Sequence, residues 1–374
     1  MNRKTAPSRI VLVLCLVLAA ACAPRGKMTV DTEAGKVGKV ETIFIGTTRD
    51  LQPDGNYGNK RSEVTHYARY AVSIPPERKL GEINWPSRFA KPNPERDFLT
   101  VSARTYPDEP AFRDELSAAL KAKGGEAVVF VHGYNNNFSE GLYRVAQFAH
   151  DLELPGVVVH YAWPSAAEPL GYVYDRDSAL FARDGLAALL DQLSDAGATR
   201  ILLVAHSMGS ALTMEALRTS ALRGDQKALK RLSAVILISP DLDVDVFRAQ
   251  ARSMGELPQP FIIFGSNRDK ILRLSARLTG QRERLGSLKD LSQVADLKVT
   301  FMDVSAFSAG ASHFALGDSP ALILLMQRMS EVEGAFEADR AARVGLLPGV
   351  VLTVQSATQV VLKPIATVGT ELAR

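Results

Sequence analysis

One serine in this sequence lies in a context that suits nucleophilic chemistry. Ser207 lies in "AHSMG", directly after the apolar run "ILLV" and before the helical pattern "SALTMEALRTS". A serine at a sharp turn between a strand and a helix exposes its hydroxyl, and its neighbours must be small because strand and helix approach closely there. We therefore predict that Ser207 is a nucleophile. The alternative left open by this short pattern is a serine that only caps a helix.

A nucleophilic serine needs a base, and the order of residues along the chain indicates which one. When a nucleophile follows a strand in this way, the acid and then the base come later in the chain. Of the six histidines only His313 follows Ser207, in the loop "SAGASHFALGDSP" after the last expected strand. His313 is therefore the predicted base. His206 precedes the nucleophile on a strand and points to the opposite face, so we expect His206, and likewise His132, to be structural.

Aspartates after two strands are candidates for the acid that orients the base: Asp269 after one, and Asp241, Asp243 and Asp245 after the other, of which Asp243 is preferred. Asp269 in "FIIFGSNRDKIL" follows the penultimate strand, where its carboxylate could accept a hydrogen bond from the second ring nitrogen of His313. Asp243 in "ISPDLDVDVF" follows the preceding strand and is the alternative acid. Either residue could instead be a helix N-cap. We predict Asp269 as the acid.

Two backbone groups are candidates for stabilising the negative charge of an intermediate. The stretch "VHGYNNNF" ends a buried strand at a glycine, and the loop after that strand can supply one N–H donor. The predicted donors are the backbone N–H of Tyr134 or Asn135 in this loop, with Tyr134 preferred, and that of Met208 at the start of the helix. The alternative is a glycine turn with solvated asparagines.

The elements that must position these residues follow an alternating pattern. From Val40 onward, short β-branched runs alternate with longer helical patterns, and the later runs are nearly continuous Val, Ile and Leu. Such strands are buried on both faces, so we predict an α/β fold with a mostly parallel, doubly wound sheet and helices on both faces. Loops are expected at 51–66 and 76–97 and one long helical segment at 175–197. The expected strands are 40–48, 69–75, 97–106, 127–133, 156–163, 200–207, 232–239, 260–266 and 297–305.

The N-terminus carries an export signal. Residues 1–21 have a basic start, an apolar run and small residues before Cys22, too short a run to span a bilayer as a mature helix. The pattern resembles a bacterial lipoprotein signal with Cys22 as the lipidated residue, and Ala23 after it favours the outer membrane, facing the periplasm. The alternative is an ordinary cleaved signal and a soluble periplasmic or secreted protein. Residues 22–39 are then expected to be a flexible tether.

Composition excludes several classes of partner. The chain has 374 residues, 46% of them apolar, and a formal charge of +3. Three basic residues belong to the predicted signal, so the mature chain is formally neutral, and we expect no nucleic-acid partner. No H-E-x-x-H, P-loop or G-x-G-x-x-G motif follows a strand, so we predict no metal and no cofactor. The sequence leaves the oligomeric state open.

The C-terminal part differs from the rest. We place the main domain at 40–335 and a C-terminal extension at 336–374. Residues 345–362 carry no charge, but Pro348 and several polar residues argue against a spanning helix. Apolar residues at helical spacing favour a helix that packs on the domain, or disorder, over a helix on a membrane surface.

Several of these stretches together resemble a known family. "FVHGYNN", "YAWPS", "YDRDSA", "AHSMG", "SPDLDVDVF", "SNRDKIL" with "RLG", and "SHFALGDSP" look like bacterial α/β-hydrolases of undetermined substrate, which are esterase- or lipase-like. The resemblance covers roughly 40–335 and implies that Ser207, Asp269 and His313 are the nucleophile, acid and base. The "YDRDSA" segment has no defined role, and Tyr174 or Arg176 could face the pocket.

These residues predict a serine hydrolase that works through an acyl-enzyme. The substrate is expected to be a small carboxylic ester or a thioester, and the membrane is expected to be contacted through the lipid at Cys22. The alternative is a non-catalytic, envelope-anchored binding module that retains the hydrolase fold. A binding role would not need nucleophile, acid, base and turn together, which favours the enzyme.

Overall fold

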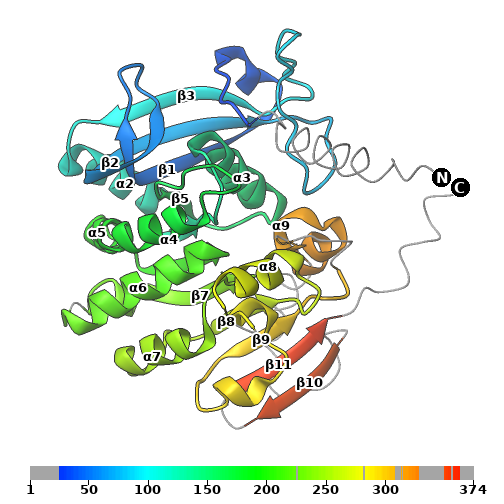
Figure 1. Ribbon diagram of the computed structural model, residues 1–374. Helices are drawn as coiled ribbons and strands as arrows, with labels where there is room; N and C mark the ends of the chain where they lie inside the picture. Colours follow the sequence, from blue (N-terminus) through cyan, green and yellow to red (C-terminus); the bar gives the residue numbers. More distant parts are fainter. Residues whose placement is uncertain are drawn as a thin grey trace, which may run out of the picture.

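The structure is a computed structural model that describes residues 25–224, 226–280, 283–307, 313, 315–327, 349–354 and 357–362. The predicted signal peptide at 1–21 and the predicted lipidation site Cys22 lie outside these residues. In the described parts of the chain, one sheet of eleven strands has the order β10-β11-β9-β8-β7-β6-β4-β5-β1-β2-β3. Figure 1 shows this sheet from β3 at the top to β10 at the bottom.

The central strands confirm the predicted parallel sheet. Neighbouring strands from β1 through β5, β4, β6, β7 and β8 to β9 are all parallel, and only the outer pairs are antiparallel. Each expected strand is present. Their bounds are β1 (Lys39–Leu51), β2 (Tyr57–Ile74), β3 (Leu99–Tyr106), β4 (Glu126–Val131), β5 (Val157–Ala162), β6 (Arg200–His206), β7 (Leu232–Ile238), β8 (Phe261–Gly265) and β9 (Thr300–Asp303).

Helices cover both faces of the sheet. One apolar cluster joins the sheet to α2, α5, α6 and α7 through side chains such as Phe112, Leu189 and Phe247. A second cluster on the other face joins it to α3 and to the helical residues 320–327. The bounds are α2 (Glu109–Ala122), α3 (Phe138–Asp151), α4 (Tyr172–Phe181), α5 (Arg183–Asp195), α6 (Met208–Leu222), α7 (Val244–Met254), α8 (Lys270–Leu278) and α9 (Ala315–Asp318).

Two local expectations were wrong. The loop expected at 51–66 is largely strand, because β1 and β2 form a long hairpin in which Arg49 pairs with Arg61. Much of this part of β2 is exposed, so it lacks the apolar alternation that identifies a strand. The single helical segment expected at 175–197 is divided at Ala182, whose carbonyl accepts a hydrogen bond from the hydroxyl of Tyr161 at 2.6 Å.

The described part of the predicted tether is packed against the domain. Val30 forms a β-bridge with Thr100 of β3, and the Asp31 N–H donates to the Thr100 carbonyl at 2.9 Å. A short 3₁₀ helix follows at Thr32–Lys36, and Ala34 within it is fully buried. The expectation of a flexible tether is therefore wrong for residues 25–39, because their backbone groups pair with a sheet strand.

The C-terminal extension contributes strands and no helix in its described part. β10 (Gly349–Val354) pairs antiparallel with β11 (Ala357–Leu362), and β11 runs parallel to β9. Runs rich in Val and Thr favour strands, and β11 covers the edge that β9 would otherwise expose. The prediction of a helix or disorder for this stretch was wrong, and the same sheet extends beyond residue 335. Within the described residues, no helix is both long enough and apolar enough to cross a membrane.

Candidate active site

Ser207 occupies a strained turn between β6 and α6. Its backbone has φ 54° and ψ −123°, a conformation that costs a non-glycine residue about 1–3 kcal/mol and persists only when the surroundings fix it. The end of β7 supplies that constraint. The Ser207 N–H donates to the Ile238 carbonyl at 2.9 Å, and the Ser207 carbonyl accepts from the Asp241 N–H at 3.1 Å. The predicted strand, turn and helix around Ser207 are confirmed.

Two glycines allow the loop after β4 to approach this turn. A Cβ atom at Gly209 would lie 2.2 Å from the His132 carbonyl oxygen, and one at Gly133 would lie 2.9 Å from Cβ of Ser207. Real Cβ atoms do not come so close to other heavy atoms. Any larger residue at either position would push the loop away from the nucleophile candidate.

His313 links the other two predicted residues of the site. Its Nε2 lies 2.8 Å from Oγ of Ser207, and its Nδ1 lies 2.6 Å from Oδ2 of Asp269. Ser207 and Asp269 are buried, and the His313 side chain is 16% exposed. With a proton on Nδ1 held by the carboxylate, Nε2 is free to accept the serine proton. The structure thus brings Ser207, Asp269 and His313 together in the order predicted.

Asp269 is a helix cap as well as the partner of His313. Its Oδ1 accepts hydrogen bonds from the N–H groups of Ile271 and Leu272 at 2.9 and 3.0 Å, at the start of α8. Asp269 therefore makes both contacts that the sequence suggested, the helix cap through Oδ1 and the contact with His313 through Oδ2. Asp243, the alternative acid, caps α7 through the Val246 N–H at 2.9 Å. The carboxylate placed against His313 is that of Asp269.

Residues 133–137, called the oxyanion loop after the role predicted for them, include a backbone N–H that has no hydrogen-bond acceptor among the described residues. The side-chain amide of Asn136 donates to the carbonyls of Gly133 and Tyr134 at 3.2 and 2.9 Å. The Gly133 carbonyl and the Tyr134 N–H belong to the same trans peptide and point in opposite directions. Because the carbonyl faces the Asn136 amide, the Tyr134 N–H points away from it. Within the described residues, the N–H groups of Tyr134 and Met208 both lack a hydrogen-bond acceptor. Both predicted donors are thus available to a ligand.

Two buried charged residues that the sequence analysis missed, Arg49 and Asp175, each hold this loop through a hydrogen bond. Arg49 is fully buried, and its Nη2 donates to the Asn136 carbonyl at 2.8 Å. Asp175, also fully buried, accepts through Oδ2 from the Asn135 N–H at 3.1 Å and the Ser165 hydroxyl at 2.6 Å. Burial lowers the pKa of Arg49 to about 10 and raises the pKa of the Asp175 carboxyl. Each residue supports a different peptide group of the loop.

The "YDRDSA" segment acquires a role from this arrangement. Asp175, and not Tyr174 or Arg176, is the member that reaches the oxyanion loop. Tyr174 lies under the guanidinium of Arg61, 4.5 Å from its ring centre, while Arg176 lines a cavity. In the sequence, Asp175 was marked only by its place in this segment, which is one of the stretches that resemble the family. Arg49 carried no such signal.

The neighbouring histidines are structural, as expected. The ring of His132 stacks on Trp163 at 4.8 Å, and its ring nitrogens lie 2.8 and 3.0 Å from the carbonyl oxygens of Gly133 and Trp163. His206 lies beside His313, with 4.9 Å between ring centres and its Nε2 3.3 Å from the His313 carbonyl. Burial lowers the pKa of both His132 and His206 well below the usual value. Because His206 is neutral, it packs beside His313 without placing a second positive charge next to that ring.

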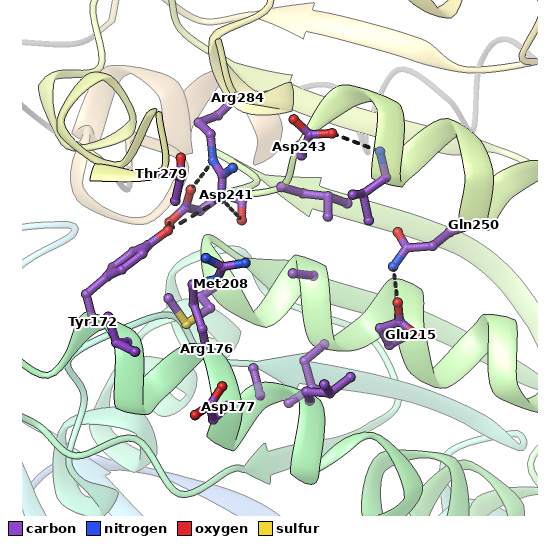
Figure 2. A pocket seen from close by; sticks show the side chains of 17 residues that line it. Tyr172, Arg176, Asp177, Met208, Glu215, Asp241, Asp243, Gln250, Thr279 and Arg284 are labelled. Carbon is purple, nitrogen blue, oxygen red and sulfur yellow. Dashed lines mark hydrogen bonds and ion pairs between the residues drawn. The ribbon is translucent and has the colours of Figure 1, made fainter. Parts of the chain in front are cut away.

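A cavity of about 430 Å³ has Met208, the residue after Ser207, in its lining and extends between α4, α6 and α7. Figure 2 shows Met208 and Arg176 on one side of it and the cluster of Tyr172, Asp241 and Arg284 at its upper end. Asp241 accepts from Arg284 Nε at 2.6 Å and from the Tyr172 hydroxyl at 3.0 Å. The lining thus combines apolar side chains with polar and charged ones, and polar groups fixed in this way can orient a small molecule.

The segment that carries Arg284, the "RLG" of the sequence, joins two strand ends near the site. The Gly286 N–H donates to the Pro240 carbonyl at 3.0 Å, and the Ser266 N–H donates to the Gly286 carbonyl at 2.8 Å. It therefore fixes the loops after β7 and β8, which carry Asp241 and Asp269. In the described parts of the chain, no group of three or more His, Cys, Asp or Glu side chains could hold a metal ion.

Comparisons with known proteins agree with this architecture. Residues 108–328 match the family described as "Alpha/beta hydrolase of unknown function (DUF900)", a range that includes all three residues of the site. No curated protein matches the chain.

Some solved structures resemble it more distantly. Aspergillus fumigatus lipase B is 13% identical over 56% of this chain and 52% of the lipase, about half its length, with a TM-score of 0.36. An esterase from Rhizomucor miehei is 12% identical over 91% of this chain and 100% of the esterase, with a TM-score of 0.38. The Pyrococcus furiosus esterase PF2001 is 12% identical over 84% and 96%, with a TM-score of 0.35.

Proposed function

Since the chain belongs to the DUF900 family of α/β hydrolases, we propose that it is a serine hydrolase that acts through an acyl-enzyme on carboxylic esters or thioesters. The observation that carries this proposal is the continuous contact from Asp269 through His313 to Ser207, at 2.6 and 2.8 Å. It is the arrangement that activates a serine hydroxyl for acyl transfer.

The proposed reaction has two halves. Oγ of Ser207 attacks the acyl carbon while Nε2 of His313 takes its proton, and the oxyanion that forms accepts hydrogen bonds from the N–H groups of Tyr134 and Met208. As the intermediate collapses, His313 returns the proton to the leaving alkoxide or thiolate. Water then repeats the sequence on the acyl-enzyme, releasing the acid and restoring the serine.

We place the acyl group in the cavity that begins at Met208. Leu180, Leu212 and Val246 contribute apolar surface, and the Asp241–Arg284 ion pair belongs to the same lining. An acyl chain long enough to reach this buried ion pair should bind less well, since an ion pair is a poor contact for an apolar chain. Turnover of p-nitrophenyl esters of graded acyl length should therefore rise and then fall as the chain grows.

A fluorophosphonate probe tests the proposal most directly, because it phosphonylates an activated serine. We expect the wild-type protein to be labelled and Ser207→Ala and His313→Ala to remain unlabelled, with unchanged thermal unfolding. Failure of folded wild-type protein to label would refute the enzyme and favour the non-catalytic binding module. Labelling that survives in Ser207→Ala would show that another residue is the nucleophile.

We also propose that the mature chain is exported and anchored by a lipid on Cys22. Arg25 follows Cys22 by three positions in the chain, a separation that spans at most about 11 Å. The anchor would therefore keep the active site close to the membrane surface. Mass spectrometry of the mature N-terminus should show a diacylated or triacylated cysteine, and Cys22→Ala should move the protein to the soluble fraction.

A further inference from the structure

We propose that Arg25 is a positioning residue of the active site, which holds the oxyanion loop in the conformation that presents the Tyr134 N–H. This inference deepens the proposed serine-hydrolase function and rests on it. Arg25 belongs to a segment that the sequence places outside the catalytic domain. The contacts of its guanidinium place it against the loop itself.

Arg25 holds Asn135 through two oxygen atoms at once. Its Nη1 donates to Oδ1 of the Asn135 side chain, and its Nη2 donates to the Asn135 backbone carbonyl, both at 2.8 Å. The same Nη2 forms an ion pair with Glu140 of α3. A planar guanidinium fixes the relative positions of its acceptors better than a flexible single donor.

Asn135 has a backbone conformation that needs such support. Its φ of 58° lies in the left-handed region, which is uncommon for a residue other than glycine. On the opposite side, the Asn135 N–H donates to Asp175 at 3.1 Å. Asn135 is thus held through its N–H by Asp175 and through its C=O by Arg25. The peptide that carries the Tyr134 N–H, between Gly133 and Tyr134, immediately precedes the one that Asp175 holds and lies two peptides before the one that Arg25 holds.

The segment around Arg25 is itself attached to the same helix start. The Gly26 N–H donates to Oε1 of Glu140 at 3.0 Å, and the Asn137 side chain donates to the Gly26 carbonyl at 2.9 Å. Asn137 is the N-cap of α3, with Glu140 as the reciprocal partner in the capping box. These contacts attach the segment of Arg25 to the start of α3.

Loss of Arg25 should therefore act on the transition state more than on substrate binding. The loop would keep its supports from Arg49 and Asp175 but lose the clamp on the Asn135 carbonyl. A displacement of about 1 Å in catalytic groups can reduce the rate about 100-fold. We expect kcat of Arg25→Ala to fall about 10- to 100-fold, with KM within about threefold of wild type.

The test compares three variants of the full chain. Arg25→Ala removes the clamp, and Arg25→Lys keeps the charge but cannot reproduce both contacts, so it should show an intermediate kcat. Lys27→Ala, which removes a charge from an exposed side chain of the same segment, is the matched control and should stay within about twofold of wild type. Each is measured for kcat, KM, melting temperature and amide hydrogen exchange of a peptide covering residues 133–140.

The outcomes separate this inference from the proposed function. A lower kcat in Arg25→Ala, with wild-type KM and melting temperature, faster exchange in the loop and partial recovery in Arg25→Lys, supports the inference. A kcat equal to that of Lys27→Ala overturns it while leaving Ser207 as the nucleophile. If wild-type protein shows no Ser207-dependent labelling, the proposed function fails and this inference fails with it.

Discussion

Substitution of Asp269 by asparagine should abolish most activity without disturbing the fold. Oδ1 of Asp269 accepts from two backbone N–H groups of α8, so an asparagine keeps its oxygen there and turns its NH₂ group toward His313. His313 must then accept at Nδ1 and carry its proton on Nε2, where it can no longer take the proton of Ser207. A wrong tautomer costs about 10⁴-fold in kcat, or about 5.5 kcal/mol of barrier.

The control for this variant is Asp243→Asn. Both aspartates are helix N-caps, and asparagine caps nearly as well as aspartate, so both variants should unfold within about 1 kcal/mol of wild type. Steady-state hydrolysis of a p-nitrophenyl ester and urea unfolding, measured side by side, separate the two roles. Asp243→Asn should retain activity within about twofold. Equal losses in the two variants would refute the assignment of Asp269 as the acid.

Three further predictions concern the scaffold. Gly209→Ala should lower the melting temperature and activity together, because its Cβ would lie 2.2 Å from the His132 carbonyl oxygen; wild-type values would refute the close approach. Burial lowers the pKa of His160 from 6.5 to about 4, so only the unfolded chain takes up this proton as pH falls from about 6.5 to 4. The free energy of unfolding should fall by up to about 3 kcal/mol over that window, and urea unfolding of His160→Gln should show a shallower pH dependence. Removing residues 336–374 should expose the edge of β9 and cause aggregation detectable by light scattering; a monodisperse product would contradict that.

The three residues of the proposed triad could be predicted for two reasons. Ser207 has a recognisable sequence context, and this fold sets the order in which the acid and the base follow it along the chain. Ser207 follows an apolar run and precedes a helical pattern, and only one histidine comes after it. The choice between Asp269 and Asp243 could only be ranked, because both follow a strand and both start a helix. Which carboxylate reaches His313 depends on the relative positions of two strand ends. The residues around each aspartate do not specify those positions.

The supports of the oxyanion loop could not be predicted for the same reason. Arg25, Arg49 and Asp175 are 110, 87 and 40 residues away from the loop positions that they contact. Each has an ordinary local sequence: a polar stretch after a signal, the end of a strand and the first turn of a helix. The strands at 349–354 and 357–362 were missed for another reason. Short Val-rich runs are compatible with both a helix and a strand, and only the position of the β9 edge decides between them.

The buried pair of Arg49 and Asp175 is better explained by positioning than by stability. Taking two charges out of water costs several kcal/mol for each ion, and apolar side chains of similar volume often stabilise a fold equally well. Nε of Arg49 has no hydrogen-bond partner in the described residues, so the burial is not fully compensated. Apolar residues could supply neither a donor for the Asn136 carbonyl nor an acceptor for the Asn135 N–H, whereas Arg49 and Asp175 supply both. The cost is thus incurred where the peptides on either side of the Asn135–Asn136 peptide must be fixed near Ser207, and Arg25 holds the peptide between them through the Asn135 carbonyl.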